Sequence, residues 1–279
     1  MDVQPHAYFR TPTRLNPGAP LFVFLPGMDG TGQLFRAQVA GVEKAFDIRC
    51  LSIPADDMTG WEQLTEQVVT LVKEEMERKP GQPVYLCGES FGGCLAIKTV
   101  LRAPHLFDRL ILVNPASSFN RRPWVYWGSY LSRLLPEQTY QLSSLGFLTV
   151  LASLDRILPE DRDALIEAIR FVTQRSSVWR QSLLRDFYVS EYQLRSVALP
   201  TLVIASAQDR LFPSVSEARR LVSLLPNAEM IVLPYSGHAC LLEKDVHLYE
   251  LMQSSRLVHP PQPTMAVRAP SAESKATSS

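Results

Sequence analysis

The sequence predicts an α/β protein built on a mostly parallel, doubly wound sheet, and three observations support this. Short apolar, β-branched runs recur along the chain without the polar alternation of a half-exposed strand, which is typical of strands covered on both faces. Segments with apolar residues at three- and four-residue spacing separate these runs and predict helices. The chain has 279 residues, 46% of them hydrophobic, which is enough to bury a large core.

The individual elements alternate for most of the chain. The apolar runs predict strands at residues 21–25, 46–53, 84–87, 110–113, 201–205 and 230–233. The periodic segments predict helices at residues 34–45, 59–79, 90–102, 214–225 and 240–253. The pair Pro80-Gly81 ends the second of these helices, and Pro104 ends the third.

One interval breaks the alternation. Between the strands at 110–113 and 201–205 there is no convincing strand, whereas residues 159–173 and 178–188 have the periodicity of amphipathic helices. We therefore expect a helical cap, residues 116–198, inserted into a core made of residues 1–115 and 199–256. Residues 257–279 are rich in Pro, Ala and Ser with no aromatic residue, so we expect a disordered tail.

Composition narrows the class of protein. Lys plus Arg equals Asp plus Glu at 28 each, so there is no global positive field to attract nucleic acid. The sequence contains neither an apolar stretch long enough to span a membrane nor a secretory signal, and we expect a cytoplasmic protein. The four cysteines form no CxxC or Cys/His ligand pattern, so we interpret them as reduced, mostly buried thiols and predict no metal site.

The strongest chemical signal is the stretch GESFGG, in which Ser90 follows a predicted strand and opens a predicted helix. Gly88 and Gly92 allow the tight turn that holds a serine hydroxyl out from the carboxyl edge of a parallel sheet. Such a turn strains the serine backbone. The alternative interpretation is a helix-capping serine beside a structural glycine turn. The position of Ser90 between a predicted strand and a predicted helix favours the nucleophile over the capping serine.

A serine nucleophile needs a base, and the base needs a carboxylate. Of five histidines, His238 stands in a glycine-containing loop after the last strand, at the sheet edge where Ser90 is expected. Asp209 follows the strand at 201–205 at that same edge. The alternatives are a loop histidine with one surface hydrogen bond and an aspartate that only forms an Asx-turn. We predict a triad of Ser90, His238 and Asp209.

Acyl transfer also creates a negatively charged oxygen that needs fixed donors. The backbone amide of Phe91, directly after the serine, is one candidate, and the amide of Met28 in the loop LPGMDGTG is the other. This loop could instead be merely flexible. Its glycines match neither GxGxxG nor GxxxxGK[ST], so we predict no nucleotide and no other cofactor.

The order Ser90, Asp209, His238 around a parallel sheet resembles the α/β-hydrolase fold over about residues 20–255. The blocks LPGMDGTG, FDIRCLSIP, VYLCGESFGGCLAI and LILVNPASSF resemble the hydrolase-type domain of the phytyl ester synthase/diacylglycerol acyltransferase-like family. That resemblance implies acyl transfer to or from lipophilic alcohols by the matching serine, aspartate and histidine. Plant members carry a further acyltransferase-like domain with an HxxxxD motif. We find no such motif in a plausible context here, which favours hydrolysis.

The predicted cap contains an aromatic cluster. We expect Trp124, Trp127 and Tyr130 to line an acyl-chain pocket and to allow transient lipid contact, although such clusters also serve simply to pack a cap on its core. The sequence therefore predicts a serine-dependent hydrolase of lipophilic carboxylic esters. The alternatives are an acyltransferase that uses a lipophilic alcohol and a non-catalytic module that binds hydrophobic ligands.

Overall fold

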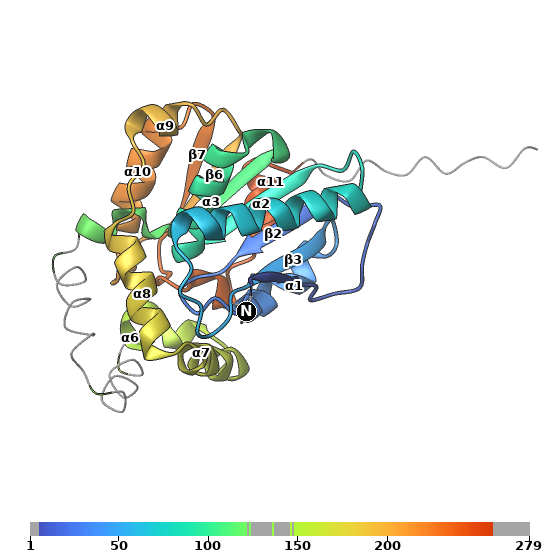
Figure 1. Cartoon of the computed structure of the whole chain (residues 1–279). Coiled ribbons are helices and arrows are strands. Elements are labelled where there is room, and N and C mark those ends of the chain that lie inside the picture. The colour runs from blue at the N-terminus through green and yellow to red at the C-terminus, as the bar shows by residue number, and fades with distance from the viewer. Residues whose placement is uncertain (1–5, 122, 124–135, 137–145, 147, 259–279) are drawn as a thin grey trace, which may run out of the picture.

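The computed structural model describes residues 6–121, 123, 136, 146 and 148–258, and its centre is a seven-stranded sheet (Figure 1). The strands lie in the order β1-β3-β2-β4-β5-β6-β7. Their bounds are β1 (Tyr8–Arg10), β2 (Leu21–Leu25), β3 (Asp47–Ser52), β4 (Val84–Glu89), β5 (Arg109–Val113), β6 (Thr201–Ser206) and β7 (Ala228–Leu233). Every neighbouring pair is parallel except β1 with β3, which is antiparallel. The prediction of a mostly parallel sheet is confirmed.

The sequence missed β1. This edge strand has only three residues, of which Tyr8 and Arg10 are exposed and Phe9 is half-buried, so they do not form an apolar run. Its register is set entirely by pairing with β3, where Tyr8 faces Ser52 and Arg10 faces Cys50. Because the strand is defined by its partner, no local pattern marks it.

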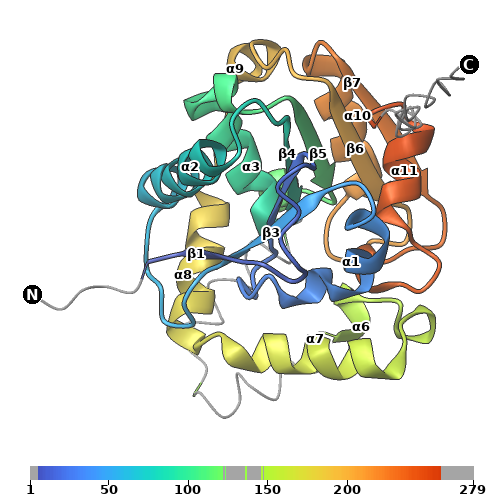
Figure 2. The same ribbon diagram turned by 90° about the vertical axis from the view of Figure 1, so that its right-hand side faces the viewer.

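Helices cover both faces of the sheet (Figure 2). Apolar side chains of α2, α3 and α10 pack on one face, and those of α1 and α11 pack on the other. Alternate residues of one strand serve the two faces, as with Leu86 and Cys87 of β4. The bounds are α1 (Arg36–Val42), α2 (Trp61–Arg78), α3 (Phe91–Arg102), α10 (Ser214–Leu224) and α11 (Leu248–Ser254).

Between β5 and β6 the described residues form helices and no strand of the sheet. These are α6 (Leu148–Leu151), α7 (Pro159–Phe171), α8 (Gln174–Arg185) and α9 (Glu191–Arg195). In Figure 1, α6, α7 and α8 gather beside one end of the sheet, whereas α9 lies beside α10. The exact division at residues 116–198 stays a prediction.

Short 3-10 turns connect several of these elements: η1 (Gln33–Phe35), η2 (Pro104–Leu106), η3 (Ala116–Arg121), η4 (Leu154–Arg156) and η5 (Cys240–Leu242). The last one corrects an expectation, because the helix predicted at 240–253 is broken into η5 and α11. The buried side chain of Gln38 holds the break: its Nε2 donates to the carbonyls of Leu241 and Val246, and its Oε1 accepts from the amide of Leu248. A long-range partner thus overrides the local helical period.

Near the C-terminal end, Leu257 and Val258 are buried against the same face as α11, although the sequence assigned them to the tail. The rest of the predicted tail, residues 259–279, lies outside the described residues. Among the described helices, none is both long and apolar enough to cross a membrane.

Candidate active site

Ser90 occupies the sharp turn between β4 and α3. Its backbone has φ +53° and ψ −112°, a region that residues with a side chain rarely adopt. The turn is packed too closely for side chains at its glycines: a Cβ on Gly92 would lie 2.0 Å from the carbonyl oxygen of Leu25, and one on Gly88 would lie 2.3 Å from that of Gly92. The expected strain is therefore present, and the glycines allow the close approach that produces it.

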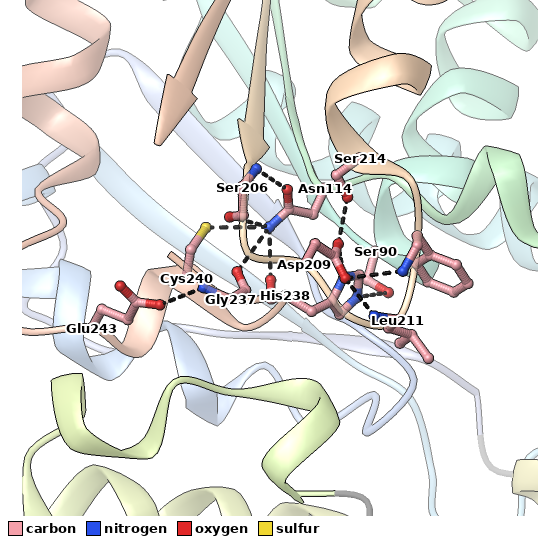
Figure 3. A network of polar contacts seen from close by, with 11 residues as sticks. Ser90, Asn114, Ser206, Asp209, Leu211, Ser214, Gly237, His238, Cys240 and Glu243 are labelled. Carbon is pink, nitrogen blue, oxygen red and sulfur yellow. Dashed lines mark hydrogen bonds and ion pairs between the residues drawn. The ribbon is translucent and has the colours of Figure 1, made fainter. Parts of the chain in front are cut away.

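His238 lies in the loop that follows β7, with 3% of its surface exposed. Its Nε2 is 2.8 Å from Ser90 Oγ, and its Nδ1 is 2.7 Å from Asp209 Oδ2 (Figure 3). A carboxylate can only accept, so the proton is assigned to Nδ1, and Nε2 is left to accept the serine hydroxyl. The structure brings the three predicted side chains together in one hydrogen-bonded chain.

Asp209 follows β6, and its carboxylate is fully engaged. Oδ1 accepts the amides of Leu211 at 2.8 Å and Phe212 at 2.9 Å, while Oδ2 accepts the hydroxyl of Ser214 as well as His238. Burial by itself would raise the pKa of Asp209, but the charge of His238 and these donors outweigh it, so the pKa is lowered. Asp209 is therefore a permanent anion at neutral pH.

The same pairing acts on the imidazole. Burial would lower the pKa of His238, but the neighbouring Asp209 carboxylate and, to a smaller extent, Glu89 raise it above its ordinary value. A histidine of this kind accepts a proton readily and is stabilised once it is charged, which are the properties that a general base needs.

The loop after β2 passes beside the serine. A Cβ on Gly27 would lie 3.8 Å from Ser90 Cβ, so the residue that precedes Met28 packs against the serine. Within the described part of the chain, neither the Met28 amide nor the Phe91 amide donates to another protein group. Phe91 is the first residue of α3, where the helix dipole favours negative charge. Both amides are thus available to an anionic oxygen.

The remaining site predictions fall on Trp124, Trp127 and Tyr130, which lie outside the described residues. All four cysteines are buried and free, as expected. In the described ranges, no cluster of three or more His, Cys, Asp and Glu side chains is arranged to hold a metal ion.

Comparison with known proteins assigns the family. A family model described as serine aminopeptidase, S33, matches residues 55–245, which include the serine turn, the aspartate and the histidine. The chain belongs to the α/β-hydrolase superfamily. Its fold matches an esterase from Exiguobacterium antarcticum with a TM-score of 0.70 at 16% identity, covering 90% of this chain and 92% of that one.

Two curated relatives come from Arabidopsis thaliana. This α/β-hydrolase is 34% identical to phytyl ester synthase 1, chloroplastic, over 85% of the chain, and 29% identical to phytyl ester synthase 2, chloroplastic, over 84%. The match spans only 37% of each relative's own length.

A further polar network of this α/β-hydrolase, centred on Asn114, fixes the histidine loop. Asn114 follows β5 in a left-handed conformation with φ +41° and is fully buried. Its Nδ2 donates to the carbonyl of His238 at 2.7 Å and to Ser206 Oγ at 2.9 Å, and its Oδ1 accepts the Ser206 amide at 2.8 Å (Figure 3). The sequence alone predicts no role for Asn114, because a single asparagine after a strand carries no local signal for these contacts.

A second support comes from the insertion. Glu243, 1% exposed, accepts the amide of Gly237 at 2.8 Å and pairs with Arg156 of η4 at 2.7 Å. The amide of Ala239 also donates to the carbonyl of Leu151 in α6 at 2.8 Å. No local pattern marks Glu243, because its role depends on contacts that only the fold creates.

Glu89 directly precedes the serine, and its pKa is raised whereas that of Asp209 is lowered. Burial raises its pKa to about 7, with the charge of His238 opposing and that of Asp29 adding. The glutamate therefore changes charge near neutral pH beside the imidazole.

Proposed function

We propose that this α/β-hydrolase is a serine-dependent hydrolase of lipophilic carboxylic esters that acts through an acyl-enzyme intermediate. The observation that carries the proposal is the chain of contacts from Ser90 Oγ through His238 to Asp209, at 2.8 Å and 2.7 Å, with the serine on a strained turn. This combination of nucleophile, base and orienting carboxylate is what acyl transfer by a serine requires.

In the proposed reaction, His238 Nε2 takes the proton of Ser90 as the serine oxygen attacks the ester carbonyl. The carbonyl oxygen becomes an oxyanion, which the amides of Met28 and Phe91 bind. The imidazolium, stabilised by Asp209, then gives its proton to the leaving alcohol as the C–O bond breaks. A water molecule, deprotonated by His238, attacks the acyl-enzyme; the acid is released and Ser90 regains its proton.

The lipophilic substrate class is supported by the relatives whose names describe phytyl ester synthesis and by the predicted lining residues Trp124, Trp127 and Tyr130. A small-molecule ester is thus the proposed partner. A cytoplasmic location stays a prediction, since both plant relatives are named as chloroplastic.

A second candidate is acyl transfer to a lipophilic alcohol, favoured by the 34% identity to a phytyl ester synthase. The same acyl-enzyme serves both reactions, and the outcome depends on whether water or an alcohol reaches it. A non-catalytic binding module is the third candidate, and it has least support because the three polar side chains stand in hydrogen-bonding order.

The nucleophile is tested with a fluorophosphonate probe. We expect it to label the wild type and to leave Ser90→Ala unlabelled, whereas equal labelling of both would refute the assignment. Ser117→Ala, a change at a partly buried serine outside this site, is the matched control and should label normally.

The reaction is tested with p-nitrophenyl esters from acetate to palmitate, with and without a long-chain alcohol. Turnover that rises with chain length and yields free acid supports lipophilic ester hydrolysis. Formation of a new ester at the expense of acid supports transfer instead. No turnover together with binding of a long-chain ligand would support the binding module.

A further inference from the structure

Arg180 joins a helix of the insertion to the loop beside the serine. It lies on α8, which begins where the Thr173 side chain caps the amide of Ser176 at 3.2 Å. The arginine is 2% exposed, and its guanidinium donates from Nη1 to the carbonyl of Met28 at 2.7 Å and from Nη2 to the carbonyl of Pro54 at 3.0 Å. One side chain of α8 thereby bridges the loops that follow β2 and β3.

This is a costly way to attach a helix. A buried guanidinium loses its hydration, and among the described residues Arg180 forms no ion pair with a carboxylate. Burial lowers the pKa of Arg180, while the more distant charges of Asp29 and Asp57 oppose that shift. An apolar side chain would pack α8 onto the core at lower cost. The charge is therefore better explained by what it holds than by attachment alone.

What it holds is the residue that presents an oxyanion donor. The amide and the carbonyl of Met28 flank a single Cα, so fixing the carbonyl restricts the rotation that aims the amide. The loop continues as a turn in which the Gly30 amide donates to the carbonyl of Gly27 at 3.1 Å. The carbonyl of Gly30 accepts the amide of Ile53 at 2.7 Å.

The guanidinium also packs directly against this turn. A Cβ on Gly30, whose φ is +68°, would lie 2.6 Å from Arg180 Nη1. The loop and the arginine thus fit each other without space for a side chain between them.

We propose that Arg180 is a positioning residue: by bridging the carbonyls of Met28 and Pro54 it holds the Met28 amide in the orientation that stabilises the oxyanion. This inference rests on the proposed serine chemistry. It makes the position of α8 part of the catalytic geometry, because displacement of the helix withdraws the bridge.

The test compares Arg180→Met with Arg175→Met, a matched control at an exposed arginine of the same helix. Rates on p-nitrophenyl butyrate are divided by the number of sites titrated with a fluorophosphonate. We expect kcat of Arg180→Met to fall by about 10- to 100-fold with KM nearly unchanged, because part of one oxyanion donor is lost. The control should keep wild-type values.

A second readout separates positioning from simple attachment. A long-chain trifluoromethyl ketone adds to the serine and forms an oxyanion, whereas the methyl ketone of the same chain length serves as the ground-state ligand. We expect Arg180→Met to weaken inhibition by the trifluoromethyl ketone by about the same factor as kcat and to leave the methyl ketone unaffected. Equal weakening of both ketones, or wild-type kcat per titrated site, would overturn the proposal.

If Arg180→Met does not fold, Arg180→Lys decides the question. Lysine keeps the charge but its ammonium is a point donor that does not match two separate carbonyls, so we expect a smaller loss in kcat and in trifluoromethyl ketone inhibition. Wild-type kcat and wild-type inhibition by the trifluoromethyl ketone in the folded lysine variant would overturn the proposed role of the bridge. Failure of the wild type itself to react with the fluorophosphonate would instead refute the proposed function, so the two failures are distinguishable.

Discussion

Asn114 Nδ2 donates a 2.7 Å hydrogen bond to the main-chain carbonyl of His238, so the residue that follows β5 fixes the loop that carries the proposed base. The same amide group also reaches Ser206 Oγ at 2.9 Å, at the end of β6. The position of the imidazole therefore depends on the neighbouring strand ends as well as on Asp209, and the carboxyl edge of the sheet behaves as one polar assembly.

Replacing Asn114 by aspartate should test this dependence. Asn114→Asp keeps the shape and the acceptor for the Ser206 amide but replaces the donor by an oxygen that faces the His238 carbonyl. We expect a loss of about 2–4 kcal/mol in the free energy of unfolding in urea and at least a tenfold slower reaction with a fluorophosphonate. Ser206→Ala is the comparison variant: it removes the Oγ that accepts from Asn114 Nδ2 but keeps the bond from Nδ2 to the His238 carbonyl, so we expect a smaller loss of stability and a labelling rate closer to that of the wild type. A wild-type labelling rate for Asn114→Asp would mean that the loop is held elsewhere.

Asp209→Asn should nearly abolish turnover. Asp209 accepts from two amides, Ser214 and His238, whereas an asparagine has one accepting oxygen and one donating nitrogen. The imidazole then loses the partner that keeps its proton on Nδ1, and we expect kcat on a p-nitrophenyl ester to fall by about 10³- to 10⁴-fold. The control is Asp163→Asn, an exposed acid of α7. Activity near the wild-type level in Asp209→Asn would assign the carboxylate role to another residue.

Much of this arrangement could be predicted from local patterns. Five of the six predicted strands overlap the observed ones with ends within two residues, and the sixth matches β2 completely. Ser90, Asp209 and His238 were expected together because each follows a parallel strand, and in such a sheet the carboxyl ends share one edge. The predicted order of parallel strands, rather than the residue types alone, made the prediction of the triad specific.

The remainder depends on contacts between segments far apart in the sequence. Arg180 and Met28 are far apart in the sequence, and so are Glu243 and Arg156. No local pattern in the sequence marks either pair as a contact. The break in the helix predicted at 240–253 likewise requires Gln38. Buried polar side chains satisfy whichever backbone groups the fold leaves open, so their partners become visible only in three dimensions.

Gly92→Ala should prevent formation of the serine turn. The added methyl group would lie 2.0 Å from the carbonyl oxygen of Leu25, which belongs to the central strand β2 and has no room to move. We expect a loss of several kcal/mol in the free energy of unfolding and no fluorophosphonate labelling. The matched control is Gly41→Ala in α1, where the nearest atom to the new Cβ is 3.8 Å away. There, the higher helix propensity of alanine should leave stability unchanged or raise it by up to about 1 kcal/mol. Normal stability and labelling of Gly92→Ala would contradict the close packing at this turn.

The pH dependence should reveal a coupled titration of His238 and Glu89. The base works only as neutral imidazole, so kcat/KM must fall as the pH decreases through the pKa of His238, which Asp209 and Glu89 raise above its ordinary value of 6.5. Glu89, with a pKa of about 7, loses its proton near neutral pH. Each group favours the charged form of the other. The apparent pKa of the acid limb of the kcat/KM profile therefore reports both groups together and not His238 alone.

Glu89→Gln removes the negative partner while keeping the shape of the side chain. The imidazolium then loses one source of stabilisation, so the pKa of His238 decreases and we expect the acid limb of kcat/KM to move to lower pH, by a few tenths of a pH unit up to about one unit. The measurement is a kcat/KM profile on a p-nitrophenyl ester between pH 5 and 9, with Glu74→Gln on the exposed face of α2 as the control. An acid limb that stays in place, or that moves to higher pH, would show that the charge of Glu89 does not reach the imidazole.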